Sequence, residues 1–420
     1  MKILYLYQHF VLPEKSGITR TYEFARRLCA MGHEVHLIAS DENQKDIKIA
    51  PYETLNSGIH IHWLPIPYHN RLSFFKRILA FSKYIIGALK CGRALQFDLV
   101  YVSSPPLTAT LPAVFLAKTR KVPLVLEVRD LWPDLPIVFK ALRDPLSKKL
   151  AKAIERFAYR KATHVIALSP GIQRAVSARG VPSKNITFIP NSCDIDSFNS
   201  QSNASIHLPP NIRSEDSIIL YPGTLGVANN ISYIIYLAKQ IQQTHSKIKF
   251  LVVGDGKERN HIQLLATQLG VLNKSFFLLD PIPKKDIPAL FQRSTLILNT
   301  LVNKKALWNS SPNKFFDALA AGKPIAINFK GWLAELIQQH DIGLVLDPTN
   351  FQKAAQQITE ALSRPLWAEK AGRNAFALGN RDFNRDLLSM RLNETLIKLI
   401  PTAKNLPSDY LSKKIASKQL

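Results

Sequence analysis

Residues 217–254 read SIILYPGTLGVANNISYIIYLAKQIQQTHSKIKFLVVG, with two short apolar runs on either side of a longer helical pattern. The runs SIILYP and IKFLVV have the length of buried strands, and each ends at a glycine. Strands that alternate with helices in this way predict a parallel sheet, because parallel strands need a long crossover between them.

The same alternation occupies most of the 420 residues. A polar, proline-containing stretch after Asn191 interrupts it, and the alternation then restarts. We therefore predict an α/β fold with two Rossmann-like parallel-sheet domains that face each other across a cleft, in residues 1–195 and 215–380. Residues 381–400 are expected to form a C-terminal helix that packs back near the first domain. The polar tail, residues 401–420, is expected to be poorly ordered.

The composition restricts the partners of the chain. Lys and Arg outnumber Asp and Glu by 55 to 31, so the surface is expected to attract phosphates or anionic lipid. We expect no nucleic-acid partner, because no nucleic-acid-binding sequence pattern accompanies this charge. Three cysteines without CxxC spacing predict neither a disulfide framework nor a zinc cluster. This cysteine usage fits a reducing cytoplasm. No apolar run is long enough to span a bilayer, so we expect any membrane contact to be peripheral.

Residues 71–95, RLSFFKRILAFSKYIIGALKCGRAL, contain six basic residues and no acidic residue. On a helical wheel the larger apolar side chains gather on one face, while most of the basic side chains lie elsewhere. This pattern fits an anionic membrane surface. It fits equally a helix whose apolar face packs on the sheet.

Two glycine turns of the second array can approach an anion. YPGTLG places Gly223 and Gly226 between a strand and a helix, and VVGDG places Gly254 and Asp255 after the next strand. Either motif alone is more often only a tight turn.

Residues 306–337, ALWNSSPNKFFDALAAGKPIAINFKGWLAELI, contain the more specific pattern. Ser311 is expected to cap a helix that opens with Pro312, so that Lys314 lies in the first turn. A cation there opposes the helix dipole unless an anion such as a diphosphate shares the site. Asp317 and Glu335 are candidates to accept hydrogen bonds from sugar hydroxyls, although single acids are more often exposed surface residues.

The first array contributes a second set of candidates. Gly17 lies in the loop between the first strand and the first helix. EVRDLWPD places Glu127, Arg129 and Asp130 at the carboxyl tip of an apolar strand, where they are expected to face the cleft. An ion pair between Arg129 and Asp130 is the structural alternative.

Six segments in this order resemble the GT-B glycosyltransferases of family 4, notably those that assemble bacterial O-antigen or capsule. The segments are QHFVLPEKSGITR, EVRDLWPD, IPNSCDIDSF, YPGTLG, VVGDG and SSPNKFFDALAAGKPIAIN. The resemblance implies a nucleotide-sugar donor in the second domain, an acceptor in the first domain, retention of anomeric configuration and no essential metal or other cofactor. A lipid-diphosphate-linked saccharide on the inner face of the cell membrane is the expected acceptor.

The residue patterns and the resemblance together define the predicted site. The catalytic candidates are Gly17, Glu127, Asp130 and Lys314. The donor-binding candidates are Gly223, Thr224, Gly226, Gly254, Asp255, Pro281, Asn309, Asn313, Asp317 and Glu335.

Two departures from the family pattern leave the donor sugar open. The loop TLGVANN lacks the Arg and Lys that family members usually offer to the diphosphate, so Lys314 is the candidate substitute. The E-x7-E pair of the family corresponds here to Asn309 and Asp317. Two alternatives therefore stay open: a nucleotide-sugar epimerase of the same architecture, and a non-catalytic sugar-binding or scaffolding subunit.

Overall fold

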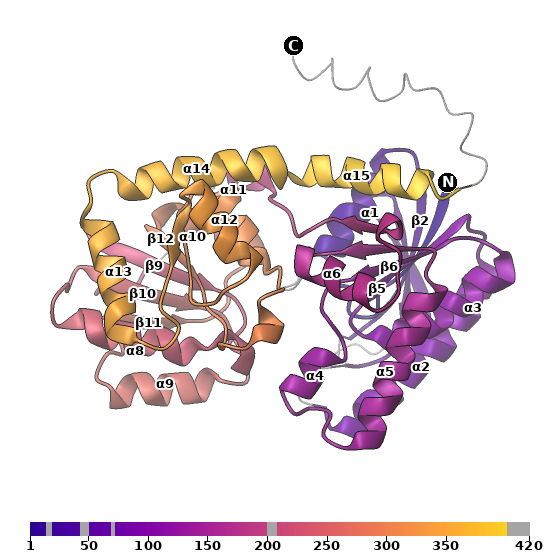
Figure 1. Cartoon of the computed structure of the whole chain (residues 1–420), viewed down its shortest axis with the longest axis horizontal. Coiled ribbons are helices and arrows are strands. Elements are labelled where there is room, and N and C mark those ends of the chain that lie inside the picture. The colour runs from indigo at the N-terminus through magenta and orange to yellow at the C-terminus, as the bar shows by residue number, and fades with distance from the viewer. Residues whose placement is uncertain (14–18, 43–49, 69–71, 200–207, 401–420) are drawn as a thin grey trace, which may run out of the picture.

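The computed structural model describes residues 1–13, 19–42, 50–68, 72–199 and 208–400. Within them the chain forms two α/β domains side by side (Figure 1). Gly17 and the tail 401–420 lie outside the described residues.

The N-terminal domain contains an eight-stranded sheet in the order β3-β4-β2-β1-β5-β6-β7-β8, parallel except for the β3–β4 pair. Its strands are β1 (Lys2–Leu6), β2 (Glu34–Ser40), β3 (Tyr52–Asn56), β4 (Ile59–Leu64), β5 (Leu99–Ser104), β6 (Leu124–Val128), β7 (His164–Ala167) and β8 (Ile186–Phe188). Its helices are α1 (Arg20–Ala30), α2 (Phe74–Ala94), α3 (Thr110–Arg120), α4 (Asp134–Val138), α5 (Pro145–Lys161) and α6 (Pro170–Ala178), with short 3₁₀ turns η1 (Leu107–Ala109) and η2 (Ser183–Asn185).

The C-terminal domain contains a six-stranded parallel sheet in the order β11-β10-β9-β12-β13-β14. Its strands are β9 (Ser217–Pro222), β10 (Ile248–Val253), β11 (Phe276–Leu279), β12 (Leu296–Asn299), β13 (Ile325–Ile327) and β14 (Gly343–Val345). Its helices are α8 (Ile231–Gln242), α9 (Arg259–Gln268), α10 (Ile287–Arg293), α11 (Asn313–Ala320), α12 (Trp332–His340), α13 (Phe351–Ser363) and α14 (Trp367–Asp382), with 3₁₀ turns η3 (Val227–Asn229), η4 (Lys284–Asp286) and η5 (Lys305–Leu307).

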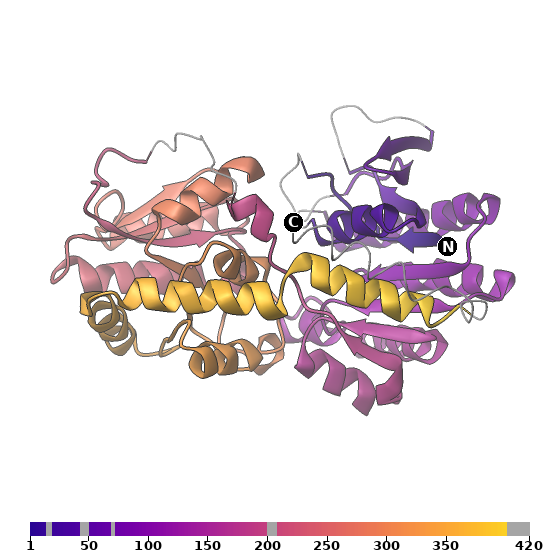
Figure 2. The same ribbon diagram turned by 90° about the horizontal axis from the view of Figure 1, so that it is seen from above.

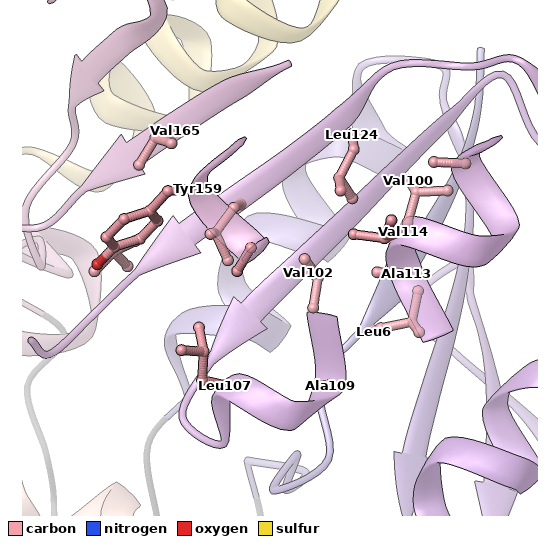
Figure 3. Packing of buried hydrophobic residues seen from close by; sticks show 14 of the residues in the cluster. Leu6, Val100, Val102, Leu107, Ala109, Ala113, Val114, Leu124, Tyr159 and Val165 are labelled. Carbon is pink, nitrogen blue, oxygen red and sulfur yellow. The ribbon is translucent and has the colours of Figure 1, made fainter. Parts of the chain in front are cut away.

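Apolar side chains cover both faces of each sheet, as expected for parallel strands between two helical layers. On one face of the N-terminal sheet Val100 and Val102 of β5 pack against Ala113 and Val114 of α3 (Figure 3). The opposite face packs against α1 and against the last helix, α15 (Arg385–Ile397), through Leu388 and its neighbours.

The chain crosses between the domains twice, and the two crossings are hydrogen-bonded to each other. The first crossing precedes the short helix α7 (Ile195–Asn199), and the second joins α14 to α15. The Cys193 amide donates to the Phe383 carbonyl over 2.7 Å, and the Arg385 amide donates to the Cys193 carbonyl over 3.1 Å. Figure 2 shows α14 on one domain and α15 lying along the other. The predicted C-terminal helix thus packs on the N-terminal domain.

The β3–β4 hairpin was not predicted from the sequence. Its two-residue loop is Ser57–Gly58, and both residues have positive φ, 49° and 81°. This is the backbone of a type I′ turn, which matches the twist of the two strands. The sequence does contain a signal for this hairpin, the turn-forming residues Asn56, Ser57 and Gly58 between two short β-rich runs.

Candidate active site

A cleft of about 610 Å³ lies between the two domains at the carboxyl ends of their strands. Eight predicted donor-site or catalytic residues line it: Gly223, Thr224, Gly254, Asp255, Pro281, Asn313, Lys314 and Asp317. Five of them follow the carboxyl ends of β9, β10 and β11. The N-terminal domain contributes Thr19 and Arg20 from the start of α1.

The turns after β9 and β10 touch each other in the cleft. The Gly223 amide donates to the Val253 carbonyl over 2.8 Å, and Gly223 and Gly254 have φ of 140° and 155°. A Cβ on Gly254 would lie 1.9 Å from the Gly223 carbonyl oxygen. Only glycine fits at Gly254, so these turns present bare backbone to the cleft.

Helix α11 begins at Asn313 beside these turns. Pro312 is its N-cap residue and has extended backbone, so the predicted Ser311 cap is wrong. The Ser311 hydroxyl instead accepts from the Asn191 amide over 3.3 Å and thereby joins the two domains. The free amides of the first turn of α11 give this end of the cleft a positive potential.

Lys314 lies in that first turn, partly buried, with its ammonium 3.7 Å from the centre of the Tyr221 ring. A Cβ on Gly223 would lie 3.2 Å from the same ammonium nitrogen. Burial lowers the pKa of Lys314 to about 7, and the negative charge of Asp317 opposes this shift. The ammonium is therefore held among apolar and aromatic groups instead of extending into solvent, which is costly for a cation unless a ligand compensates it.

Glu127 does not face the cleft, contrary to the prediction. Its side chain is 1% exposed and accepts hydrogen bonds from Arg20 over 2.9 Å, from the Tyr101 hydroxyl over 3.0 Å and from the Ser103 hydroxyl. Burial alone would raise the Glu127 pKa, but Arg20 and Arg129 lower it below its usual value. Glu127 is thus a buried charge that positions Arg20, and Arg20 is the residue that reaches the cleft.

Arg129 and Asp130 form no ion pair within the described part of the chain. The Arg129 guanidinium is buried and lies 5.2 Å from the centre of the Tyr7 ring. Burial raises the Asp130 pKa, and Arg129 opposes the shift. Asp130 is partly buried at the carboxyl edge of the N-terminal sheet and is not among the residues that line the donor cleft.

Three predicted donor-site residues lie outside the cleft lining. Gly226 is the N-cap residue of η3 and is not among the lining residues. Glu335 is exposed on α12. Asn309 lies so close to Gly171 of α6 that a Cβ on Gly171 would be 1.7 Å from the Asn309 side-chain oxygen, so Asn309 contacts the N-terminal domain.

Several residues that line the cleft were not among the predicted site residues, because they come from the domain crossings. Asp194 and Arg385 line it, with 3.8 Å between the Arg385 Nε and an Asp194 carboxylate oxygen. Arg27 lies 3.8 Å from the other Asp194 oxygen. Asp194 therefore belongs to an arginine cluster at the hinge, and Phe198 and Phe291 supply apolar walls nearby.

Comparison with known proteins identifies the family. Residues 17–192 match the family model of the glycosyl transferase 4-like domain, and residues 202–377 match that of glycosyl transferases group 1. The chain belongs to the GT-B glycosyltransferases of family 4. Among curated relatives of this glycosyltransferase is WcaI of Escherichia coli K12, named as a colanic acid biosynthesis glycosyl transferase. It is 24% identical over 387 residues, which are 87% of this chain and 93% of WcaI.

Solved structures confirm the predicted GT-B fold. Sucrose-phosphate synthase of Thermosynechococcus elongatus has a TM-score of 0.74 at 16% identity, over 95% of this glycosyltransferase and 98% of that chain. HepE of Anabaena, solved in complex with UDP and glucose, has a TM-score of 0.67 at 18% identity, over 95% and 100% of the two chains. At such identities the likeness establishes the fold alone.

Proposed function

We propose that this glycosyltransferase moves a sugar from a nucleoside-diphosphate sugar to a lipid-linked saccharide, with retention of anomeric configuration. The observation that carries the proposal is Lys314, whose ammonium is held in the cleft at the start of α11 beside the Gly223 turn. A lysine, a helix N-terminus and two glycine turns form an arrangement suited to a diphosphate.

The diphosphate is the leaving group, and the site is arranged to stabilise its growing charge. Lys314 and the first amides of α11 act where negative charge develops as the sugar–phosphate bond breaks. Asp317 lies one turn further along α11 and lines the same cleft, where a carboxylate can accept hydrogen bonds from sugar hydroxyls. The structure of HepE with UDP-glucose supports a nucleotide sugar in a cleft of this fold.

In the transfer step, the bond from the anomeric carbon to the phosphate oxygen breaks while a bond to the acceptor hydroxyl forms on the same face of the sugar. The hydroxyl proton passes to the departing phosphate oxygen, so the step needs no base from the protein. Asp130, at the carboxyl edge of the N-terminal sheet, is the candidate to orient the acceptor. No essential metal or other cofactor is required in this scheme, since Lys314 and the helix dipole supply the positive charge.

We assign the acceptor to lipid-linked saccharides and the pathway to bacterial surface polysaccharide. The name of WcaI, the formal net charge of +24 and the family resemblance support this assignment. Within the described residues, no helix is long and apolar enough to cross a membrane. We place the enzyme in the cytoplasm, on the inner face of the membrane.

The test is incubation of the purified protein with UDP-, GDP- and dTDP-sugars and a lipid-diphosphate-linked acceptor, followed by mass spectrometry of nucleotide and lipid. Glycosylated lipid with equimolar nucleotide release is the expected result. Isomerised nucleotide sugar without lipid would assign an epimerase instead, and donor binding without turnover would assign a sugar-binding subunit.

The variant Lys314→Ala tests the role of Lys314 in the same assay. Its turnover should fall about 10²-fold or more, as for loss of one charge-stabilising group. Lys304→Ala, which removes an exposed lysine from the same domain, is the matched control and should keep its turnover. Equal turnover in the two variants would contradict the assigned role of Lys314.

A further inference from the structure

The N-terminal domain carries an unusual concentration of exposed apolar side chains on α2, α3 and α5. Figure 1 shows these helices beside one another, on the side of the domain away from α15. Of the fourteen large apolar residues that are exposed in the described chain, eight lie on them. They are Phe75, Ile78, Leu79, Ile86, Phe115, Leu146, Leu150 and Phe157.

Packing on the sheet does not account for the apolar residues of α2. The buried residues Ala80, Tyr84 and Ala88, spaced four apart, face the core, and Leu89 and Cys91 in the second half of α2 pack against it in part. Phe75 is 81% exposed and Leu79 is 55% exposed. The sequence left two interpretations of residues 71–95, a membrane-facing helix and a helix whose apolar face packs on the sheet. The second interpretation is wrong for Phe75 and Leu79, because both side chains are exposed.

Helix α5 has the same arrangement. Ala151, Ala158 and Tyr159 pack inward, whereas Leu146 is 76% exposed and Leu150 is 61% exposed. In the sequence, the basic residues of α5 can extend the charged patch of residues 71–95 or simply decorate another exposed helix. The sequence pattern of α5 alone does not show that its apolar residues stay exposed.

The two helices meet through shared neighbours. Helix α3 and turn η1 each contact both α2 and α5. Helices of a parallel array run opposite to their strands, so the first turns of α2 and α5 lie toward the carboxyl edge of the sheet, where the cleft opens. Phe75, Ile78 and Leu79 are in the first turns of α2, and Leu146 and Leu150 are in the first turns of α5. Five of the eight exposed apolar residues therefore lie toward the cleft side of the domain.

The exposed charges within α2 and α5 are all positive, and the exposed acid beside them is Asp144, which caps α5. Helix α2 contains no acidic residue. The one acid within α5, Glu155, is buried and lies 3.0 Å from Arg179. The basic residues of the two helices are Lys76, Arg77, Lys83, Lys90, Arg93, Lys148, Lys149, Lys152, Arg156, Arg160 and Lys161.

We propose that the first halves of α2 and α5 together form a docking face for an anionic lipid bilayer, which holds the carboxyl edge of the N-terminal sheet at the headgroups. Apolar side chains enter the headgroup–acyl boundary, and the surrounding lysines and arginines contact anionic headgroups. This deepens the proposed function, because a lipid-linked acceptor then presents its saccharide beside the cleft.

The test is co-sedimentation of the full-length protein, without donor or acceptor, with vesicles of phosphatidylcholine alone or with 30 mol% phosphatidylglycerol. We expect binding to the anionic vesicles at least tenfold tighter than to the neutral ones, weakening as salt rises. Phe75→Ser/Leu79→Ser and Leu146→Ser/Leu150→Ser should each weaken binding about tenfold. Lys149→Gln/Lys152→Gln should weaken it and reduce the salt dependence.

Leu264→Ser is the matched control, because Leu264 is 58% exposed on α9 of the other domain. It should bind vesicles like the wild type. Circular dichroism and the thermal midpoint confirm folding of every variant, and the substituted side chains are exposed, so all should fold.

Equal binding to neutral and anionic vesicles would overturn the proposal, as would full binding by both apolar double variants. A dimer that these substitutions dissociate would assign the face to a second copy of the chain. Vesicle binding is measured without donor or acceptor, so it tests the docking face independently of catalysis. A protein that binds anionic vesicles but shows no transfer activity would contradict the proposed transferase function only.

Discussion

The ammonium nitrogen of Lys314 lies 3.7 Å from the centre of the Tyr221 ring, although the two residues belong to different strand–helix units of the C-terminal domain. Tyr221 is fully buried near the end of β9, and its hydroxyl donates to the Thr224 carbonyl over 3.0 Å. The ring face attracts the cation and fixes it at the mouth of the Gly223 turn. Burial removes the ammonium from water and lowers its pKa, whereas the negative charge of Asp317 opposes this shift.

This placement predicts that nucleotide affinity depends on pH above neutrality. The pKa of Lys314 is about 7 in the free protein, and a bound diphosphate must raise it. Below pH 7 the ammonium is already formed. Above pH 7 binding must take up a proton, so affinity should fall up to tenfold per pH unit until the raised pKa is reached.

Titration calorimetry with UDP or GDP between pH 7 and 9 measures this effect, since the nucleotide phosphates are fully ionised there. Repeating the titration in buffers of different ionisation enthalpy gives the number of protons taken up on binding. We expect nearly one proton at pH 8.5. In Lys314→Arg the charge is permanent, so its affinity should be independent of pH. A wild-type affinity that stays constant from pH 7 to 9 would contradict the assigned pKa.

A second prediction concerns the contact between the two glycine turns. Gly254→Ala would place a Cβ 1.9 Å from the Gly223 carbonyl oxygen, so the turn after β9 and the turn after β10 must move apart, and the position of Gly223 beside Lys314 changes. We expect nucleotide affinity to fall about tenfold and the free energy of unfolding to fall by about 1–3 kcal/mol. Gly180→Ala is the control, because Gly180 has φ of 97° but nothing within 4 Å of its Cβ position. If both variants bound nucleotide like the wild type, the turns would not hold the diphosphate.

The third prediction separates stability from catalysis at Glu127. Glu127→Gln removes the charge that pairs with the buried Arg20, and breaking one partner of such a pair costs about 3–5 kcal/mol. Urea denaturation should show this loss. Glu369→Gln, in the exposed pair of Glu369 and Arg373, should cost less than about 1 kcal/mol. If Glu127→Gln kept its stability but lost its turnover, the catalytic role predicted for Glu127 from the sequence would be correct.

The sequence predicted the elements better than the direction of individual side chains. Alternating strands and helices sufficed for both sheets, because this periodicity follows directly from burial on two faces. Lys314 was found because a cation in the first turn of a helix needs an electrostatic explanation. Glu127 was misplaced because a position near the carboxyl end of a strand does not show whether the side chain faces the cleft or the core. Arg20 and Arg385 line the cleft from segments far apart in the chain, and no local pattern marks them.

Asn309 provides the last prediction, because the resemblance assigned it to the donor whereas the structure places it against the other domain. A Cβ on Gly171 would lie 1.7 Å from the Asn309 side-chain oxygen, so Gly171→Ala must push η5 and the following loop away from α6. We expect this variant to lose about 1–3 kcal/mol of stability and several-fold in transfer rate, with nucleotide affinity unchanged.

The double-mutant cycle with Asn309→Ala tests the contact itself. Shortening Asn309 removes the atoms that the new methyl group would meet, so Gly171→Ala/Asn309→Ala should recover most of the lost stability and rate. The coupling energy should be favourable by about 1–2 kcal/mol. If Asn309→Ala alone weakens nucleotide-sugar binding tenfold, the donor-binding role is correct, because the Gly171 contact does not involve the nucleotide. If the double variant is as impaired as the sum of the singles, Asn309 and Gly171 are not in contact in solution.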